Sequence, residues 1–411
     1  MNAPFEVVIL NDQAALNGGS ASVALASARG LSARSIKVTL FTCVGPVAPE
    51  LLNVPNLEVI CLGQSEIAKD SSRIRAFVTG IRNASAVEAV RTLLGGKRRD
   101  RTIVHVHSWT KALSPFALGA VSELGFPLVA TLHDFFIACP NGGFFVHGPN
   151  VLCGLRPLSA GCIRCSCDRR NYAHKLWRTA RTVMQNDVLE IPRKIAHFVG
   201  VSDFSVKILR PHLPPAVPVT VVRNPLECVN SGPVSAGSNG NFVFIGRFEV
   251  EKGARLFAEA VVATGLPAVF IGDGSLMAEL RSLCPNSRFT GWIGREAIRD
   301  ELEMARAIVF PPLWYETLGL VVMEAIAAGV PAIISDQCAA TDVIRDNVNG
   351  MHFTRGSVDS LAARMREMSV DRALAGRLGM TGYKAYWADP WTLDRHVGDL
   401  LGVYNQVMKA A

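Results

Sequence analysis

Short apolar runs alternate with longer helix-like stretches along the first half of the chain. The first run, residues 7–10, is apolar throughout, and a glycine turn at residues 17–20 leads into an Ala-rich stretch that ends near Gly30. Runs of the same kind are expected to be strands at residues 36–43, 57–61, 102–107, 128–132, 195–202 and 217–222. Helices are expected between them, most clearly at residues 71–94, 169–193 and 203–209. Because strands that alternate with helices form parallel sheets, this half predicts a Rossmann-like, doubly wound domain.

A small, polar, Gly-rich segment at residues 231–241 is typical of a linker, and the alternation restarts after it. Strands are expected at residues 242–245, 268–271, 288–290, 307–310 and 332–335, and helices at residues 254–264, 275–283 and 295–305. The sequence therefore predicts an α/β protein of two Rossmann-like domains, residues 1–227 and 228–388, that face a central cleft. Residues 389–411 form an amphipathic helix that we expect to pack back on the first domain.

A loop rich in cysteine, glycine and proline interrupts the first half at residues 135–168. Its five cysteines are Cys139, Cys153, Cys162, Cys165 and Cys167. A Cys-x₂-Cys pair with two outlying thiols matches a structural zinc site on Cys139, Cys153, Cys162 and Cys165, and an Fe–S cluster is the rarer option. The alternative is a set of reduced thiols that pack an irregular loop.

Composition narrows the class of protein. With 49% apolar and 19% charged residues in 411, the chain is globular and large enough for two cores. Its net charge of +7 is mild, which argues against nucleic acid and suits an anionic substrate or docking on an acidic membrane face. No apolar run is long enough to span a bilayer, and the N-terminus lacks a basic leader, so we expect a cytoplasmic protein, in reach of the inner face of the membrane.

The predicted helix at residues 169–193 is basic and amphipathic. Its basic residues include Arg169, Arg170, Lys175, Arg178 and Arg181. One interpretation is an ordinary domain helix whose charged face is solvated, and the other is a helix that docks on anionic lipid headgroups.

The strongest candidate chemistry lies in residues 310–329. An apolar run ends in two prolines, a loop carries Glu316, and an apolar helix containing Glu324 follows. The N–H groups around Leu318 and Gly319 would lie at the N-terminus of this helix, where an anion is favoured. Because a carboxylate in an apolar helix needs polar partners, we expect hydroxyl groups on both glutamates. This pattern predicts a nucleotide sugar, with its diphosphate on the helix end and its ribose and hexose on the two glutamates.

Two basic residues follow the first strand of the second half. Arg247 and Lys252 offer a bidentate fork and a point charge, the usual means of holding a diphosphate, although a solvated surface pair is the alternative. Gly272 and Gly274 also follow a strand, but the third glycine of a dinucleotide fingerprint is replaced by Met277, so a tight turn is the simpler interpretation. No Asp-x-Asp motif occurs in the sequence, and metal-independent neutralisation of the diphosphate is therefore favoured.

Together these motifs resemble the family-four retaining glycosyltransferases of GT-B fold, also called glycosyl transferases group 1. The resemblance is strong over residues 241–353, where it rests on Gly246 with Arg247, Glu251-Lys252-Gly253, Gly272-Asp273-Gly274, Phe289-Thr290-Gly291-Trp292, and Glu316 with Glu324. It is looser over the first half, where it rests on Gly18 with Gly19, His133 with Asp134, Val201 with Ser202, and Asn224 with Pro225.

The resemblance implies a role for each candidate residue. Arg247 and Lys252 would hold the diphosphate and stabilise the leaving nucleotide, while Glu324 would bind the ribose and Glu316 the hexose. The other donor-binding residues that it implies are Gly18, Gly19, Gly246, Gly272, Gly274, Trp292, Ile293, Thr317, Leu318 and Gly319.

Some of these implied roles have alternatives. His133 would meet the donor sugar near its C6 hydroxyl, but it could instead be a structural histidine whose hydrogen bonds are satisfied. Trp292 or Ile293 would border the base. Glu316 is not assigned as a covalent nucleophile, because retention in this family is usually explained by attack on the same face with assistance from the leaving phosphate.

The sequence thus predicts a retaining glycosyltransferase that moves a hexose-type sugar from a nucleotide diphosphate sugar to a glycan or polyprenyl-linked saccharide, in synthesis of cell-envelope or other polysaccharides. No cofactor is expected in catalysis, and the zinc considered above would be structural. A non-catalytic protein that binds a sugar nucleotide or a partner is one alternative, and a Rossmann-type oxidoreductase is another.

Overall fold

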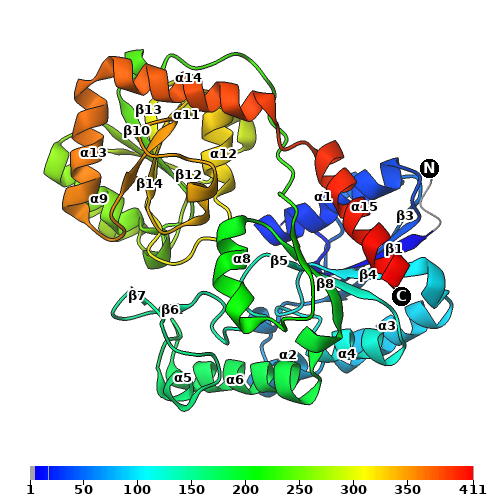
Figure 1. Ribbon diagram of the computed structural model, residues 1–411. Coiled ribbons are helices and arrows are strands. Elements are labelled where there is room, and N and C mark those ends of the chain that lie inside the picture. Colours follow the sequence, from blue (N-terminus) through cyan, green and yellow to red (C-terminus); the bar gives the residue numbers. More distant parts are fainter. Residues whose placement is uncertain (1–4, 17, 411) are drawn as a thin grey trace. The chain divides into compact units, whose positions relative to one another are not determined.

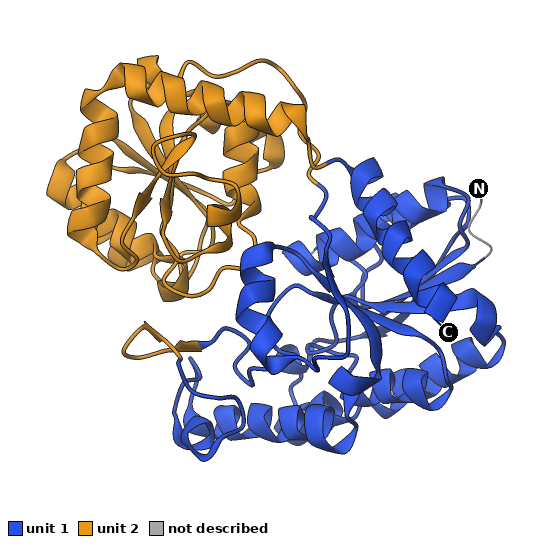
Figure 2. Cartoon of the chain, viewed as in Figure 1, with its two compact units in different colours: residues 1–144, 154–225, 392–411 blue, residues 145–153, 226–391 orange. Residues whose placement is uncertain are grey.

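The protein forms two compact units. The computed structural model describes residues 5–16 and 18–410. Unit 1 contains residues 1–144, 154–225 and 392–411, and unit 2 contains residues 145–153 and 226–391 (Figure 2). The division near residue 226 lies next to the predicted boundary, and the inclusion of residues 145–153 in unit 2 was not foreseen.

Unit 1 is built on a seven-stranded sheet with the strand order β3-β2-β1-β4-β5-β8-β9, in which every pair is parallel. Its strands are β1 (Glu6–Gln13), β2 (Val38–Val44), β3 (Leu57–Gln64), β4 (Thr102–Val106), β5 (Leu128–Leu132), β8 (Ile195–Gly200) and β9 (Val219–Val221). The central strands are buried along their whole length, which explains why they read as unbroken apolar runs.

The helices of unit 1 cover both faces of this sheet (Figure 1). They are α1 (Gly19–Ala33), α2 (Arg73–Ile81), α3 (Ala84–Gly95), α4 (Pro115–Glu123), α5 (Ala160–Arg164), α6 (Tyr172–Val183), α7 (Ile191–Lys194), α8 (Asp203–Leu209) and α15 (Leu393–Ala410). The single helix expected at residues 71–94 is two helices, because Asn83 leaves the helical conformation and its side chain caps α3 by accepting a hydrogen bond from the Ala86 amide. The helix expected at residues 169–193 is likewise divided, by a π-helical turn at Met184–Val188.

The final helix, α15, packs within unit 1, on α1. Gly30 of α1 lies so close to Val397 that a Cβ atom there would clash with that side chain. Tyr404 is fully buried and its hydroxyl lies 2.6 Å from Nδ1 of His105 on β4. The C-terminal segment is therefore part of the unit 1 core.

Unit 2 repeats the same architecture with six parallel strands in the order β12-β11-β10-β13-β14-β15. Its strands are β10 (Asn241–Ile245), β11 (Ala268–Ile271), β12 (Arg288–Gly291), β13 (Ala305–Phe310), β14 (Ala332–Ser335) and β15 (Gly350–Phe353). Its helices are α9 (Ala254–Thr264), α10 (Met277–Leu283), α11 (Arg295–Glu303), α12 (Leu320–Ala327), α13 (Val358–Val370) and α14 (Arg372–Ala388). A cluster of phenylalanine rings around Phe244 and Phe270 fills one side of the sheet.

Shorter elements complete the fold. The cysteine-rich loop, expected to be irregular, contains α5 and an antiparallel hairpin of β6 (Phe145–Val146) and β7 (Val151–Leu152). Short 3-10 turns occur at Pro49–Leu51, Ile67–Lys69, Arg99–Arg101, Arg210–His212, Ala236–Ser238, Val250–Lys252 and Ala339–Asp342. Among the described residues, no helix combines the length and the apolar character that a bilayer span requires.

Candidate functional site

The candidate site of unit 2 lies where its strand order reverses. The first strand, β10, has β11 on one side and β13 on the other, so the loops that follow β10 and β13 leave the same edge of the sheet side by side. Ligands of open parallel sheets bind at such a switch point. These two loops carry Arg247 and Lys252, and Glu316, respectively.

Backbone contacts hold the two loops together. Gly253 has a φ of +75°, and a Cβ atom there would overlap the carbonyl oxygen of Pro311. The amide of Leu313 also donates a hydrogen bond of 2.9 Å to the carbonyl of Glu251. The glycine is therefore required for the close approach that brings the basic loop against the acidic one.

Lys252, Glu316 and Trp314 form one polar cluster in this pair of loops. Nζ of Lys252 lies 2.6 Å from Oε2 of Glu316, and the indole Nε1 of Trp314 donates to the same oxygen at 2.9 Å. The ammonium also lies 5.0 Å from the centroid of the Trp314 ring, in a cation–π contact. Both of these hydrogen bonds are made to Oε2 of Glu316.

Trp314 was not among the site residues predicted from the sequence. Its position two residues before Glu316 was a usable signal, because an indole N–H within a loop of this kind needs a hydrogen-bond acceptor.

Arg247 has an acidic neighbour of its own. Its Nη2 lies 3.9 Å from Oε1 of Glu251, and the arginine side chain is half exposed whereas that of Glu251 is buried. Within the described residues, Oε2 of Glu251 has no hydrogen-bond partner. A buried carboxylate oxygen without a hydrogen-bond partner favours a nearby cation, so Glu251 helps to keep the Arg247 guanidinium at this edge of the sheet.

Gly272 and Gly274 shape the adjoining loop. A Cβ atom on Gly272 would overlap the carbonyl of Gly246, and one on Gly274 would clash with the backbone of Phe248. The loop after β11 therefore rests directly on the loop that carries Arg247. The sequence interpretation was a turn that lets backbone approach a ligand, and in the structure the backbone that it approaches is that of the neighbouring loop. Ligand contact by Gly246, Gly272 and Gly274 stays a prediction.

The N-terminus of α12 lies at the same edge. Gly319 precedes the helix in the left-handed conformation, with a φ of +82°, and no acidic side chain occupies the first turn. The amide of Val322 donates to the carbonyl of Gly319, and the helix dipole favours an anion beside the amides that precede it. Thr317 and Leu318 come directly before this turn, and the amide of Ala339 ties the loop down by donating to the carbonyl of Glu316.

Glu324 lines a cavity of about 550 Å³ within unit 2. The walls of the cavity are α11, α12 and the extended segment of residues 227–235. Burial raises the pKa of Glu324, and Arg295, which lines the same cavity, partly offsets that rise. Trp292 and Ile293 are not among the lining residues, and the Trp292 side chain is 64% exposed. The border that they were expected to form with a base stays a prediction.

In unit 1 the candidate residues also follow parallel strands. Gly18, with a φ of +93°, precedes α1, and Gly19 is the first residue of that helix; both are exposed. The remaining residue of their turn, Asn17, lies outside the described residues. His133 follows β5 and is half-buried.

His133 is held by a second histidine that the sequence analysis missed. Nδ1 of His107, directly after the adjacent strand β4, lies 3.0 Å from Nε2 of His133, and the two rings stack. Within the described residues, Nε2 of the buried His107 has no partner. Because a buried N–H without an acceptor is more costly than a buried lone pair, we infer that His107 is protonated on Nδ1 and His133 on its own Nδ1.

His105, His107 and His133 are neutral. Burial lowers the pKa of His105 and of His133 to about 3, and it lowers the pKa of His107 well below the ordinary value. Next to His133, burial raises the pKa of the Asp134 carboxyl to about 6, although that carboxylate accepts a hydrogen bond from the Phe136 amide.

These pKa shifts predict a loss of stability in mild acid. Unfolded histidine binds a proton below pH 6.5, whereas buried His105 and His107 do not, so the unfolded state takes up more protons as the pH falls. Between about pH 6.5 and pH 5.5 each should cost about 1 kcal/mol of the free energy of unfolding, measured by urea denaturation. A His107→Asn variant should show a smaller decrease than the wild type, and an equal decrease in both would contradict the assignment.

Comparison with known protein families gives one match for each half of the chain. A family model described as Glycosyltransferase Family 4 matches residues 17–228, more than half of the chain, and one described as Glycosyl transferases group 1 matches residues 235–385. The chain belongs to glycosyltransferase family 4. This membership excludes the Rossmann-type oxidoreductase that the doubly wound halves had left open.

Relatives of this family 4 glycosyltransferase match it over part of its length. It is 25% identical over 176 residues to an O-antigen chain mannosyltransferase C of Escherichia coli (41% of this chain, 47% of that protein), and 25% identical over 293 residues to a glycogen synthase of Mycobacterium tuberculosis (67% and 62%). The chain thus spans less than two thirds of the length of the curated relatives it matches.

Solved structures resemble the glycosyltransferase over its whole length. Sucrose-phosphate synthase from Thermosynechococcus elongatus superposes with a TM-score of 0.73 at 18% identity, over 99% of this chain and 100% of that one. Anabaena HepE in complex with UDP-glucose superposes with a TM-score of 0.66 at 14% identity, over 97% and 99%. These likenesses show the GT-B fold, as predicted.

The predicted zinc site of this glycosyltransferase finds no support in the structure. No disulfide joins any of the ten cysteines, and no group of three or more Cys, His, Asp and Glu side chains in the described ranges is gathered closely enough to hold a metal ion. Cys139 is buried, which raises the pKa of its thiol, and Cys162 accepts a hydrogen bond of 3.5 Å from Nζ of Lys175. The sulfur atoms of Cys139 and Cys162 pack the loop, as the alternative interpretation proposed, and a zinc site that adds Cys153 and Cys165 stays a prediction.

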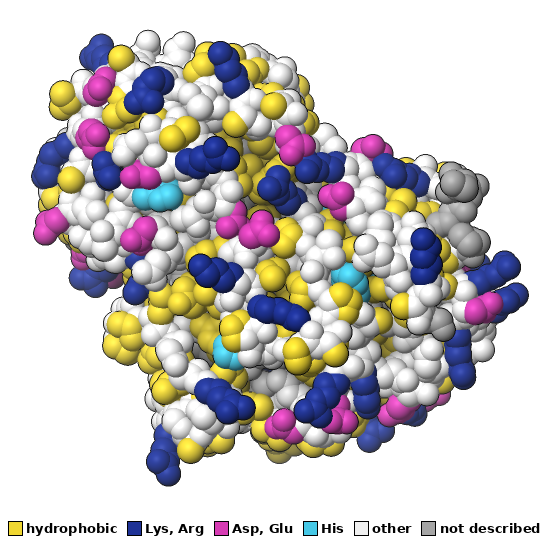
Figure 3. All heavy atoms as spheres, in the orientation of Figure 1, with side chains coloured by type: hydrophobic (Ala, Val, Ile, Leu, Met, Phe, Trp, Pro, Cys, Tyr) yellow, Lys and Arg dark blue, Asp and Glu magenta, His cyan; other side chains and the backbone are white. Residues whose placement is uncertain are grey.

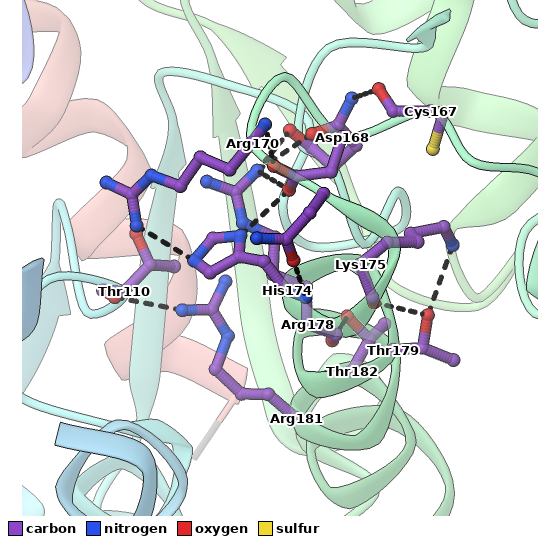
Figure 4. Close-up of polar contacts among 12 residues, drawn as sticks. Thr110, Cys167, Asp168, Arg170, His174, Lys175, Arg178, Thr179, Arg181 and Thr182 are labelled. Atoms are coloured by element: carbon purple, nitrogen blue, oxygen red, sulfur yellow. Dashed lines mark hydrogen bonds and ion pairs between the residues drawn. The ribbon is translucent and has the colours of Figure 1, made fainter. Parts of the chain in front are cut away.

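The basic residues of the helix predicted at residues 169–193 were expected on a solvated or lipid-facing side. For Lys175, Arg178 and Arg181 this is wrong (Figure 4). Lys175 is completely buried and donates to Thr179 Oγ1, and the buried Arg181 donates to the carbonyl of Thr110. Arg178 lies 3.2 Å from the carboxylate of Asp168. The helical pattern gave the period of the charged stripe correctly, but the sequence did not show that this stripe faces inward.

Proposed function

We propose that the chain transfers a hexose-type sugar from a nucleotide diphosphate sugar with retention of configuration and without a catalytic metal. The observation that carries the proposal is the cluster of Lys252, Glu316 and Trp314, with Arg247 on the same loop as Lys252, at the switch point of unit 2 and beside the N-terminus of α12. Two cations and a helix end together can neutralise the charge that develops on a departing diphosphate.

Each group of the site has a part in this reaction. Arg247 grips the diphosphate with its planar fork, and Lys252 supplies a compact charge to the leaving phosphate oxygen. Glu316, held through Oε2, presents Oε1 to the hydroxyls of the hexose. Glu324 presents its carboxylate to the ribose hydroxyls from the wall of the 550 Å³ cavity, whose size is in the range that small-molecule sites occupy.

The parts that unit 1 plays rest on the family resemblance together with its local geometry. Gly18 and Gly19 precede and begin α1, so their backbone can approach a phosphate without a side chain in the way. His133 is neutral and stacks on His107, and the family resemblance implies a position near the donor sugar. We assign it a binding role and not that of a general base.

The names of the relatives guide the choice of donor and acceptor. A 32%-identical match over 108 residues is named for GDP-mannose dependence (Corynebacterium glutamicum), whereas HepE was solved with UDP-glucose. Both donors are therefore to be tried. The O-antigen and phosphatidylinositol mannoside relatives support a growing glycan or a lipid-linked saccharide as the acceptor, in polysaccharide synthesis at the cytoplasmic side of the cell envelope.

A binding assay with separate donor and nucleotide series tests this proposal. Unfolding temperatures are measured with UDP, GDP, ADP and their hexose conjugates, for the wild type and for Glu324→Gln and Glu316→Gln variants. We expect one nucleotide series to raise the unfolding temperature, Glu324→Gln to weaken binding of every member of that series, and Glu316→Gln to weaken the sugar conjugates alone.

Release of free nucleotide from the stabilising conjugate, with or without a glycan acceptor, then tests for turnover. Stabilisation without any turnover would favour the non-catalytic binding protein. Stabilisation by none of the nucleotides would contradict the proposal.

A further inference from the structure

Helix α6 is folded with its polar side inward. The buried residues of its polar stripe are Lys175, Thr179, Arg181 and Thr182. Its outward side carries Tyr172 and Leu176, which are 40% and 42% exposed. An ordinary surface helix has the opposite arrangement, with an apolar stripe on the core and charges in solvent.

The polar interior under α6 is satisfied, which explains why the helix can remain in this orientation. Arg178 pairs with Asp168 (Figure 4) and donates to Asn141 Oδ1 at 2.8 Å. The guanidinium of Arg181 lies over the rings of Phe136 and Trp177. Rotation of α6 to bury its apolar side would leave these cations without partners, at a larger cost than the exposure of two apolar side chains.

Helix α2 likewise has its apolar side exposed. Ile74, Phe77 and Val78, at positions i, i+3 and i+4, form one apolar stripe and are 80%, 50% and 56% exposed. The buried residues of α2 are Ala76 and Gly80, which are small.

Gly80 of α2 packs against Trp177 of α6, and its lack of a side chain fixes the orientation of α2 on α6. A Cβ atom at Gly80 would clash with the indole of Trp177 on α6, and the indole Nε1 donates a hydrogen bond of 3.1 Å to the carbonyl of Phe77. Phe77 of the stripe contacts the Trp177 ring, with ring centroids 6.4 Å apart, while Ile74 and Val78 are exposed. Both helices therefore display apolar residues at the surface of unit 1. We call the exposed residues Ile74, Phe77, Val78, Tyr172 and Leu176 the α2/α6 face.

The exposed charges around this face are mostly basic. The side chains of three nearby acids are largely covered: Glu66 is 14% exposed, Asp70 15% and Asp168 2%. The exposed basic residues of the flanking segments are Lys69, Arg73, Arg75, Arg82, Arg164, Arg169 and Arg170. Arg75 pairs with Asp70, and Asp187, in the π-helical turn directly after α6, is an exposed acid. Basic, acidic and hydrophobic side chains are all visible along the lower edge of unit 1 in Figure 3, where α2 and α6 lie in Figure 1.

We propose that the α2/α6 face docks unit 1 on an anionic phospholipid surface, with the apolar residues at the level of the acyl boundary and the arginines on the headgroups. An apolar stripe inside a mostly basic rim is the pattern of interfacial helices that bind anionic lipid. The inference rests on these two helices and not on the transfer reaction. If the proposed function holds, docking also brings the enzyme to a lipid-linked acceptor.

Co-sedimentation with vesicles tests the proposal on the full chain. We expect the wild type to bind vesicles of phosphatidylcholine with about 30% phosphatidylglycerol, to bind pure phosphatidylcholine far more weakly, and to lose most of the binding between about 0.1 M and 0.5 M NaCl. The double variant Ile74→Gln/Val78→Gln keeps good helix formers in α2 and should lower the partition coefficient about tenfold.

A matched control removes two equally exposed apolar residues from unit 2. Val262 and Val370 are 57% and 85% exposed, and the Val262→Gln/Val370→Gln variant should bind vesicles like the wild type. Circular dichroism shows whether both double variants remain folded, and donor binding by each reports on the proposed function separately. Binding that is equal on neutral and anionic vesicles, or unchanged in Ile74→Gln/Val78→Gln, would overturn the proposal. So would the absence of vesicle binding together with a dimer that this variant abolishes.

Discussion

The Lys252→Met variant should lose about 10³-fold in kcat/KM for the nucleotide sugar while it keeps its fold. The substitution preserves most of the side-chain length and removes the charge that lies 2.6 Å from Glu316, so the leaving diphosphate loses one of its two cations. Removal of one charge-stabilising group from an active site costs about 3 kcal/mol of transition-state stabilisation, which corresponds to this factor. Initial rates of nucleotide release give the measurement.

Arg255→Met provides the control for Lys252→Met. Arg255 lies on α9, three residues further along, and its side chain is 60% exposed and paired with Glu259 at 2.9 Å. This variant loses the same charge from unit 2 but no group of the site, so we expect its kcat/KM to stay within about twofold of the wild type. Equal activities of the Lys252 and Arg255 variants would remove Lys252 from the reaction.

The Gly253→Ala variant should be strongly destabilised, by about 3 kcal/mol or more in the free energy of unfolding of unit 2. Two causes act together: alanine at a φ of +75° is strained, and its Cβ would overlap the Pro311 carbonyl, which forces the loops of Lys252 and Glu316 apart. Urea denaturation followed by tryptophan fluorescence measures the change. Any folded fraction should also bind donor weakly.

Gly265→Ala separates these two causes. Gly265 ends α9 with a φ of +67°, close to that of Gly253, but no atom lies within 4 Å of the Cβ position. Its replacement should cost about 1 kcal/mol, the strain of the backbone alone. If both glycine variants lost the same stability, the contact between the two loops would not be what requires Gly253.

Much of the fold was predictable from the sequence, because buried parallel strands leave a strong signal. The apolar runs at residues 128–132 and 268–271 coincide with β5 and β11, and the glycine-rich turns at strand ends predicted where loops would gather. The error at residues 71–94 arose from Asn83, whose capping side chain ends the apparent continuity of one helical pattern.

The candidate site was predictable residue by residue but not as a set of contacts. Arg247, Lys252 and Glu316 could be identified from type and position, yet nothing local to Lys252 indicates that it reaches Glu316, 64 residues away. The same limit hid His107, whose partner follows another strand, and Glu251, whose burial depends on the packing of two loops. Periodicity gave the stripes of α2 and α6 but not which side faces the core, because the satisfaction of buried cations is a property of the tertiary structure.

A crystal structure of the protein with the nucleoside diphosphate that stabilises it most is the most direct test of the central claim. We expect the diphosphate oxygens within hydrogen-bonding distance of Lys252 Nζ and of the first amides of α12, with the ribose on Glu324. A diphosphate bound away from the loops that follow β10 and β13, or a complex in which Glu316 and Glu324 both point away from the ligand, would contradict the account.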